Sequence, residues 1–265
     1  MNPTNYKTIL SDLINPLWVT YCQRVPQVLK IHHLLEEHNK RVVHDHISFR
    51  TVNLPWTSGS VLTEKLGQFG YCLRDSASRP EENLELYWLH HPAPEVPAIL
   101  ITELDVHCLS QPLQSLLKEI TSENDTPPLW SLNHIPPKKP TLQQFETLQS
   151  DNEMAAWFSL FGTSAHYFSV SVNHLDRQND MLKLVKLLME EGFALDNRSG
   201  LIRESAHQMI KQVVSLPDQI EISFSPEEKV RVSTGCYHFT LRFKSPSGKL
   251  YKKFFSDTFS RAKAD

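Results

Sequence analysis

The sequence has few cysteines and lacks the spacings that mark a zinc or redox site. The four cysteines of its 265 residues lie far apart and form no CxxC pair: Cys22, Cys72, Cys108 and Cys236. We therefore expect reduced thiols, as in the cytoplasm. No apolar run approaches the roughly 20 residues that a membrane helix needs, and the first residues do not resemble a signal peptide. These absences favour a soluble, cytoplasmic protein without a membrane partner.

The sequence also has no marked excess of charge of either sign. It contains 27 Lys and Arg against 30 Asp and Glu, and this net charge of -3 argues against a nucleic-acid partner. The motifs GxSxG, HExxH, GxGxxG and the P-loop do not occur, so serine hydrolases, zincins and nucleotide-binding proteins have no motif support. Histidine is frequent instead, with 13 residues, which keeps metal chemistry open.

The hydrophobic pattern predicts an α+β protein in which one order of elements occurs twice. Helical spacing over residues 1–40 predicts an N-terminal helical cap. From residue 41 the pattern alternates and predicts a βαβββ-type module that extends to residue 125. Its elements are a strand at 43–52, a helix at 58–69, strands at 71–75, 84–90 and 98–106, and a helix at 109–120.

A proline-rich segment separates this module from a second one. Thr126–Thr141 contains five prolines, and we expect a linker and a helix (142–160) over residues 126–165. The second module, 166–265, repeats the order. Its elements are a strand at 167–174, a helix at 180–191, and strand candidates at 212–216, 219–224, 230–232 and 236–243. Paired modules of this kind form one integrated domain, with a curved, mostly antiparallel sheet around a pocket.

The first strand of the first module carries side chains that can bind a metal ion or a carboxylate. Alternation places His46, Ser48 and Arg50 on one face of this strand and Ile47 and Phe49 on the other. An arginine fork suits a carboxylate, and an imidazole suits a metal ion. The same letters also fit an ordinary surface strand, so the pattern by itself leaves both interpretations open.

Two other strands present histidines at related places in the repeat. His174 ends the first strand of the second module, and His238 shares a face of the last long strand with Arg242. Imidazole ligands suit iron, zinc, copper or nickel. Each histidine alone also fits a surface or core position. Glu103 lies on an otherwise apolar strand, where it is either a buried carboxylate with a partner or metal, or a surface residue near the strand end.

Four segments resemble the 2-oxoadipate dioxygenase/decarboxylase family, the D-2-hydroxyglutarate synthases of bacterial and plant lysine breakdown. The resemblance runs from about residue 40 to the C-terminus. The segments are His44-Asp45-His46-Ile47-Ser48-Phe49-Arg50-Thr51, Ile101-Thr102-Glu103-Leu104, Val172-Asn173-His174 and Cys236-Tyr237-His238-Phe239. The resemblance implies a fold like that of vicinal oxygen chelate proteins. It also implies an Fe(II) ion held by two histidines and one glutamate. His46 and His174 match the two histidines, and Arg50 matches an arginine that binds the substrate carboxylate.

The sequence departs from the family at the glutamate ligand. The family has Tyr-Glu-Phe where this chain has Tyr237-His238-Phe239. His238 would then complete a three-histidine site, with Glu103 as an alternative ligand. The resemblance implies that 2-oxoadipate and O2 give 2-hydroxyglutarate and CO2, with Arg50 and, as a second candidate, Arg242 on the substrate carboxylates. Two alternatives remain: a zinc-dependent hydrolase or lyase on the same scaffold, and a non-catalytic metal- or ligand-binding module.

Overall fold

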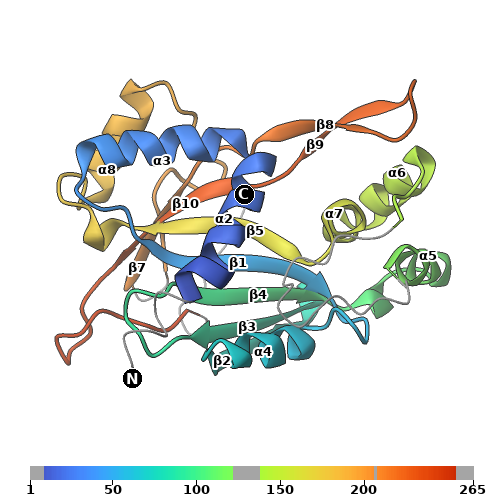
Figure 1. Cartoon of the computed structure of the whole chain (residues 1–265), viewed down its shortest axis with the longest axis horizontal. Coiled ribbons are helices and arrows are strands. Elements are labelled where there is room, and N and C mark those ends of the chain that lie inside the picture. The colour runs from blue at the N-terminus through green and yellow to red at the C-terminus, as the bar shows by residue number, and fades with distance from the viewer. Residues whose placement is uncertain (1–8, 122–137, 206–207, 255–265) are drawn as a thin grey trace.

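A computed structural model describes residues 9–121, 138–205 and 208–254, and its centre is one curved sheet with helices on its outside (Figure 1). The chain begins with a short π-helix and two α-helices: η1 (Leu10–Ile14), α2 (Asn15–Arg24) and α3 (Pro26–His38). Pro26 begins α3, because its fixed φ angle suits the first turn and its missing N–H has no intrahelical partner there. These helices confirm the predicted N-terminal cap.

Two βαβββ modules build the sheet. The first consists of β1 (His44–Val52), α4 (Gly59–Gln68), β2 (Cys72–Arg79), β3 (Leu84–His90) and β4 (Ala98–Leu104). The second consists of β5 (Ser164–Ser171), α8 (Met181–Glu190), β6 (Arg203–Glu204), β7 (Ile210–Val214) and β10 (Cys236–Arg242). The strand order is β2-β3-β4-β1-β5-β10-β7-β6, so the first strands of the two modules meet at the centre. Neighbouring strands are antiparallel except for the parallel pairs β1–β4 and β5–β10, which confirms the predicted architecture.

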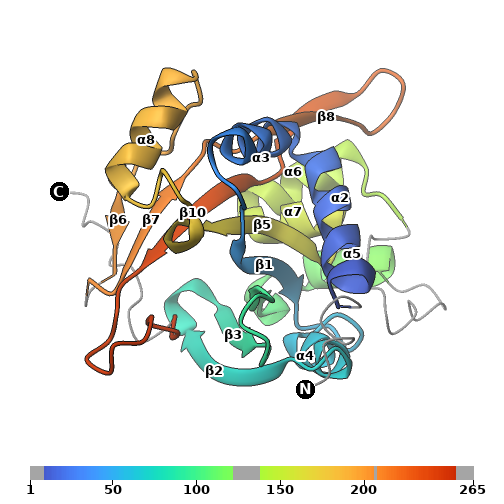
Figure 2. The ribbon, with the colours of Figure 1, turned by 60° about the vertical axis from the view of Figure 1, so that its left-hand side comes forward.

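The remaining elements lie outside this repeat. They are α5 (Gln111–Thr121), α6 (Leu142–Asp151), α7 (Glu153–Phe161), the hairpin β8 (Gln219–Ser223) and β9 (Lys229–Ser233), and the 3-10 turns η2 (Pro80–Glu82), η3 (Val106–Cys108) and η4 (Val172–His174). Figure 2 labels α5, α6, α7 and β8 among them. The single helix expected at 142–160 is two helices, because Asn152 ends α6 and its side chain caps α7 by accepting from the Ala155 N–H. Most of the proline-rich linker, 126–137, lies outside the described residues.

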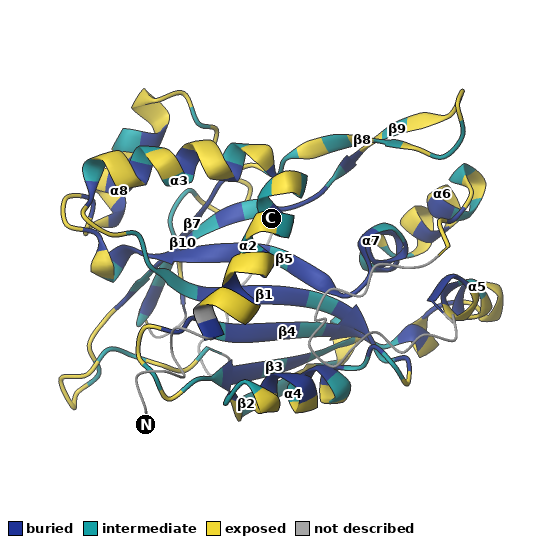
Figure 3. Cartoon of the chain, viewed as in Figure 1, coloured by how far each residue is buried: buried dark blue, intermediate teal, exposed yellow. Residues whose placement is uncertain are grey.

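The two faces of the sheet have different environments. Ile47 and Phe49 of β1 point to the outer face and are buried with α2, α3, α4 and α8 in the largest apolar cluster. His46 and Ser48 point to the opposite, concave face, and the strands there are also largely buried (Figure 3). A smaller apolar cluster lies on the concave face, with Leu86, Trp88, Leu100 and Tyr167 as its buried members.

Two local irregularities change which side chains reach the concave face. The β1–β5 register shifts between His44 and His46, and again between the Ser48–Tyr167 and Phe49–Ala165 pairs. Each shift inserts one extra residue, as a β-bulge does. Strand β5 also ends at Ser171, so His174 lies in the turn η4 and not in the strand in which the sequence placed it.

Candidate functional site

His46 is the most completely oriented histidine on the concave face. It has no exposed surface, and its Nδ1 lies 2.7 Å from Oδ1 of Asp45. A carboxylate only accepts, so Nδ1 carries the proton and Nε2 is left as the acceptor. The Nε2 atom lies 3.4 Å from the Tyr167 hydroxyl. A carboxylate on one nitrogen and a free second nitrogen is the arrangement expected of a metal-ligating or proton-accepting histidine.

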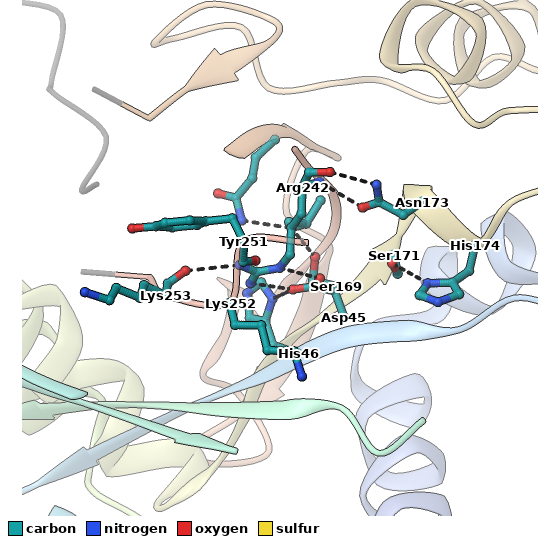
Figure 4. A network of polar contacts seen from close by, with 12 residues as sticks. Asp45, His46, Ser169, Ser171, Asn173, His174, Arg242, Tyr251, Lys252 and Lys253 are labelled. Atoms are coloured by element: carbon teal, nitrogen blue, oxygen red, sulfur yellow. Dashed lines mark hydrogen bonds and ion pairs between the residues drawn. The ribbon is translucent and has the colours of Figure 1, made fainter. Parts of the chain in front are cut away.

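Asp45 reaches His46 because of the β1 bulge. Its two oxygens also accept a bidentate pair from Arg242, at 2.7 Å from Nε and 2.9 Å from Nη2 (Figure 4). Burial alone would raise the pKa of Asp45, but Arg242 and the hydrogen bond from His46 hold this pKa well below its ordinary value. Asp45 is therefore a carboxylate that fixes the orientation of His46.

His238 also lies on the concave face, but Tyr167 stands between it and His46. The rings of Tyr167 and His238 stack at 3.6 Å between centroids and 6° between planes. The His238 Nε2 atom contacts the Cys236 thiol at 3.3 Å, and its buried Nδ1 has no hydrogen-bond partner among the described residues. Burial lowers the pKa of His238, so this side chain is neutral and retains one unused polar atom.

His174 is separate from these residues. It is exposed in η4, where its Nδ1 lies 2.8 Å from the Ser171 hydroxyl. It lines a cleft of about 120 Å³ together with Asp45, Trp88 and Arg242. Figure 4 shows His174 on the far side of Ser171 from the carboxylate of Asp45. His174 therefore lies at this cleft just beyond the end of β5, and within the described part of the chain no hydrogen bond or ring contact joins it to His46 or His238.

Glu103 points to the other face of the sheet. It pairs with Thr51, the neighbour of Arg50, so alternation places it on the outer face. Its carboxylate accepts from the Gly59 N–H at the start of α4 and, at 3.1 Å, from the Tyr87 hydroxyl. Glu103 therefore binds the N-terminus of α4 on the face opposite His46, and its alternative role as a metal ligand stays a prediction.

Arg242 is likewise a structural residue rather than a free carboxylate clamp. Besides its pair with Asp45, its Nη1 donates to the carbonyl oxygens of Tyr251 and Lys253, each at 3.1 Å. Its backbone exchanges two 2.8 Å hydrogen bonds with the Asn173 side chain. All three guanidinium nitrogens are occupied, so the expected contact between Arg242 and a substrate carboxylate is not supported.

The residues present do not complete the metal site that the resemblance implies. Among the described residues, no three His, Cys, Asp or Glu side chains form a group that could hold a metal ion. His46 has the orientation of a ligand and His238 has an orphaned nitrogen, but His174 and Glu103 do not join them. Within the described ranges, the donor set for Fe(II) therefore lacks a third residue.

Arg50 is a half-buried cation that has no acidic partner among the residues that the structure describes. It lies on the concave face of β1, and its guanidinium carbon is 5.4 Å from the centre of the Trp157 indole. In the described part of the chain, no carboxylate lies within ion-pair distance of Arg50. Burial lowers the pKa of Arg50, and the more distant charge of Glu153 opposes this shift. A buried cation needs an anionic or hydrogen-bonded partner, so Arg50 is suited to bind a carboxylate.

Sequence reasoning missed His166 and Arg24. The β5 bulge turns His166 toward the concave face, where burial and the nearby charges of Arg50 and His238 lower its pKa. Arg24 of α2 lies over the same Trp157 indole, at 5.4 Å, and its buried Nε has no hydrogen-bond partner in the described part of the chain. Strict alternation excluded His166, and a helical pattern gave no reason to place Arg24 beside a sheet.

Comparisons with known proteins find relatives whose sequence identity to this chain is low but extends over most of its length. The chain is 22% identical over 237 residues to a 2-oxoadipate dioxygenase/decarboxylase of Arabidopsis thaliana, covering 83% of this chain. It is 23% identical over 261 residues to the protein of that name in Oryza sativa, covering 92% of this chain. The alignments span 64% and 71% of these relatives, respectively. No family model matches the chain.

Solved structures have the same fold. A protein named as a hydrolase from Shewanella frigidimarina has a TM-score of 0.84 at 25% identity and covers 92% of this chain and 97% of its own. The hydroxyglutarate synthase of Oryza sativa, solved with 2-oxoadipate, has a TM-score of 0.84 at 22% identity, with 93% and 84% covered. A glyoxalase superfamily protein from Ralstonia eutropha has a TM-score of 0.74 at 18% identity, with 90% and 83% covered.

These matches agree with the sequence motifs and with the paired modules. No helix among the described residues is long and apolar enough to cross a membrane. The resemblance indicated by the motifs is thus confirmed: over most of its length, this chain is similar to proteins of the 2-oxoadipate dioxygenase/decarboxylase family, and it has their glyoxalase-like fold.

Proposed function

We propose that this chain is an enzyme that acts on a 2-oxo dicarboxylic acid at the concave face. The first candidate reaction converts 2-oxoadipate and O2 into 2-hydroxyglutarate and CO2, which balances with no further reactant. The names of two curated relatives and the 2-oxoadipate bound to a structural neighbour support this choice. The observation that carries it is Arg50, a half-buried cation on the concave face without a carboxylate partner among the described residues.

The chain's own residues account for binding and orientation. Arg50 would hold one substrate carboxylate, and Trp157 keeps its guanidinium in place by stacking. His46, oriented by Asp45, would present Nε2 toward the reacting end, beside the Tyr167 hydroxyl. Leu100 and Trp88 form a buried apolar wall that excludes water from the same region. Decarboxylation of a 2-oxo acid is favoured in such a poorly hydrated site.

We infer Fe(II) as the cofactor from the resemblance, with Zn(II) as the alternative. The metal would supply oxygen activation, and His46 and His238 are the donors that face the concave side. Because these residues do not form a complete donor group, the metal requires a test that does not depend on turnover. Metal content after anaerobic loading and desalting provides that test, and substitution of His46 by alanine should reduce it.

The incomplete donor group supports one second candidate, a binding protein for 2-oxo acids without catalysis. Arg50 and the apolar wall would then act as before, and no oxygen would be consumed. This candidate predicts saturable binding of 2-oxoadipate together with full recovery of the unchanged acid.

An oxygen electrode distinguishes the two candidates. The chain is loaded anaerobically with Fe(II), and oxygen uptake is recorded with a panel of 2-oxo acids that differ in length and in the distal carboxylate. We expect uptake with 2-oxoadipate, and weaker uptake with 2-oxohexanoate, which cannot pair its far end with Arg50. Oxygen uptake equal to that of the acid-free control, for every acid, would reject the enzyme. Anaerobic turnover with Zn(II) would indicate the hydrolase or lyase instead.

A further inference from the structure

The C-terminal part of the described chain crosses the concave face as a strap, residues 251–254. Hydrogen bonds from two side chains hold its backbone: the Trp88 indole N–H donates to the Lys252 carbonyl at 3.0 Å, and Arg242 Nη1 donates to the carbonyls of Tyr251 and Lys253. The Tyr251 N–H also donates to the Phe243 carbonyl at 2.9 Å. Figure 4 shows this segment beside Arg242, on the same side as Asp45 and His46. The strap therefore reaches the candidate site through its backbone, independently of its own side-chain charges.

The last residue of the strap inserts its ring beside His46. The Phe254 ring stacks on Trp88, with 4.8 Å between centroids and 22° between planes. It meets the His46 ring edge-to-face at 5.3 Å and 65°. Phe254 also packs against the apolar cluster of the concave face. The Phe254 ring thus covers the edge along which Trp88 and His46 meet, and we call the position of this ring, between an apolar wall and an oriented imidazole, the slot.

We propose that this slot is a binding site for the methylene chain of an organic acid, and that Phe254 occupies it while no acid is bound. The inference rests on the proposed function for the identity of the acid. A ligand that brings its reacting end to His46 must place the adjoining carbons against Trp88, because His46 and Trp88 themselves pack at 5.4 Å. The Phe254 ring fills that volume. The acid and Phe254 are therefore alternative occupants, and Phe254 is an intramolecular competitor.

The bonding of Arg242 allows the strap to leave without disturbing His46. The strap uses only Nη1 of the guanidinium, whereas Asp45 is held by Nε and Nη2. The Asp45 carboxylate that Nε and Nη2 hold is also the one that accepts the hydrogen bond from His46. Release of the strap would break the bonds from Arg242 Nη1, the Trp88–Lys252 bond and the backbone bond of the strap. It would not break the bonds from Nε and Nη2 to Asp45, so the orientation of His46 would survive the exchange.

The test compares Phe254→Ala with the control Phe243→Ala in the full chain. Phe243 lies just after β10 and contacts Lys211, not the concave face, so the control removes a similar ring from the same region. The first readout is the rate at which diethyl pyrocarbonate modifies His46, followed by peptide mass spectrometry. The second is the Kd of adipate, which has both carboxylates but no reactive oxo group, measured by calorimetry.

We expect Phe254→Ala to raise the modification rate at His46 and to tighten adipate binding, each by roughly threefold or more, because removing a competing state raises the fraction of binding-competent chains. Phe243→Ala should change neither value. A Phe254→Ala protein that matches the control in either readout would overturn the proposal. Tighter adipate binding without any oxygen uptake would retain the slot and reject the proposed enzyme, so the two failures are distinguishable.

Discussion

Asp45 connects His46 and Arg242, two side chains that lie far apart in the sequence. Its carboxylate accepts from His46 and from Arg242, and all three side chains are almost fully buried. A buried ion pair is costly to desolvate, so it is retained where it fixes a geometry. In this chain the fixed geometry is the direction of His46 Nε2. The assignment of a site to the segment around His46 stays a prediction, and Arg242, which was expected on the substrate, holds Asp45 in the structure.

Arg50→Met tests the carboxylate contact. Loss of a charge-assisted hydrogen bond contributes about 1.5–3 kcal/mol, which corresponds to about tenfold to hundredfold in affinity. We expect the KM for 2-oxoadipate, or its Kd if there is no turnover, to rise by that factor while metal content stays the same. Arg231→Met, at an exposed site on β9, is the matched control and should have no effect. An unchanged Kd in Arg50→Met would remove Arg50 from the substrate site.

At the scale of elements, alternation predicted the straight parts of strands and failed at their irregularities. The strands around Ile47, Phe49, Tyr237 and Phe239 have the faces that the sequence indicates, because burial of one face constrains the register. The bulges in β1 and β5 add single residues that no period-two pattern can locate. They account for the position of Asp45 and for the absence of His166 from the predicted site.

Glu103→Gln tests the structural role assigned to this carboxylate. Glu103 accepts from Gly59 at the N-terminus of α4, where the helix dipole favours a negative charge. We expect the free energy of unfolding, from urea titration, to fall by about 1 kcal/mol, with metal content unaffected. Glu221→Gln, which removes an exposed carboxylate paired with Lys229, should change stability little. A loss of bound metal in Glu103→Gln would contradict the assignment.

Asp196 gives the connection between α8 and β6 a defined pH dependence. Hydrogen bonds from Arg198 and Arg203 lower the pKa of Asp196 far below its ordinary value. In the unfolded chain an aspartate titrates near about 3.9. The unfolded state therefore binds the proton first, and the contribution of Asp196 to stability, complete above about pH 4, is lost as the pH falls further.

Asp196→Asn should remove the contribution that the ionised Asp196 carboxylate makes to the free energy of unfolding. The variant should unfold at lower urea concentration than the wild type at pH 7, and the difference should shrink between pH 4 and pH 2. Urea midpoints measured across this range provide the check. A constant difference at all pH values would show that the ionised carboxylate is not the stabilising form.

At the scale of the whole molecule, the fold was more predictable than the site. A repeated order of strand, helix and three strands constrains the topology, because neither module can bury both faces of its sheet alone. The site depends instead on single turns: η4 removes His174, and Glu103 lies one residue out of phase with the concave face. Such displacements of one or two residues leave the hydrophobic pattern unchanged, so a sequence pattern does not record them.

Product stoichiometry with carbon-13-labelled 2-oxoadipate tests the central claim most directly. The chain, loaded anaerobically with Fe(II), is exposed to a known amount of O2, and the labelled acids and CO2 are quantified by mass spectrometry. We predict one 2-hydroxyglutarate and one CO2 for each O2 consumed, and a much lower yield in Arg50→Met. Complete recovery of labelled 2-oxoadipate, with no labelled CO2, would contradict the claim that this concave face is the active site of a dioxygenase/decarboxylase.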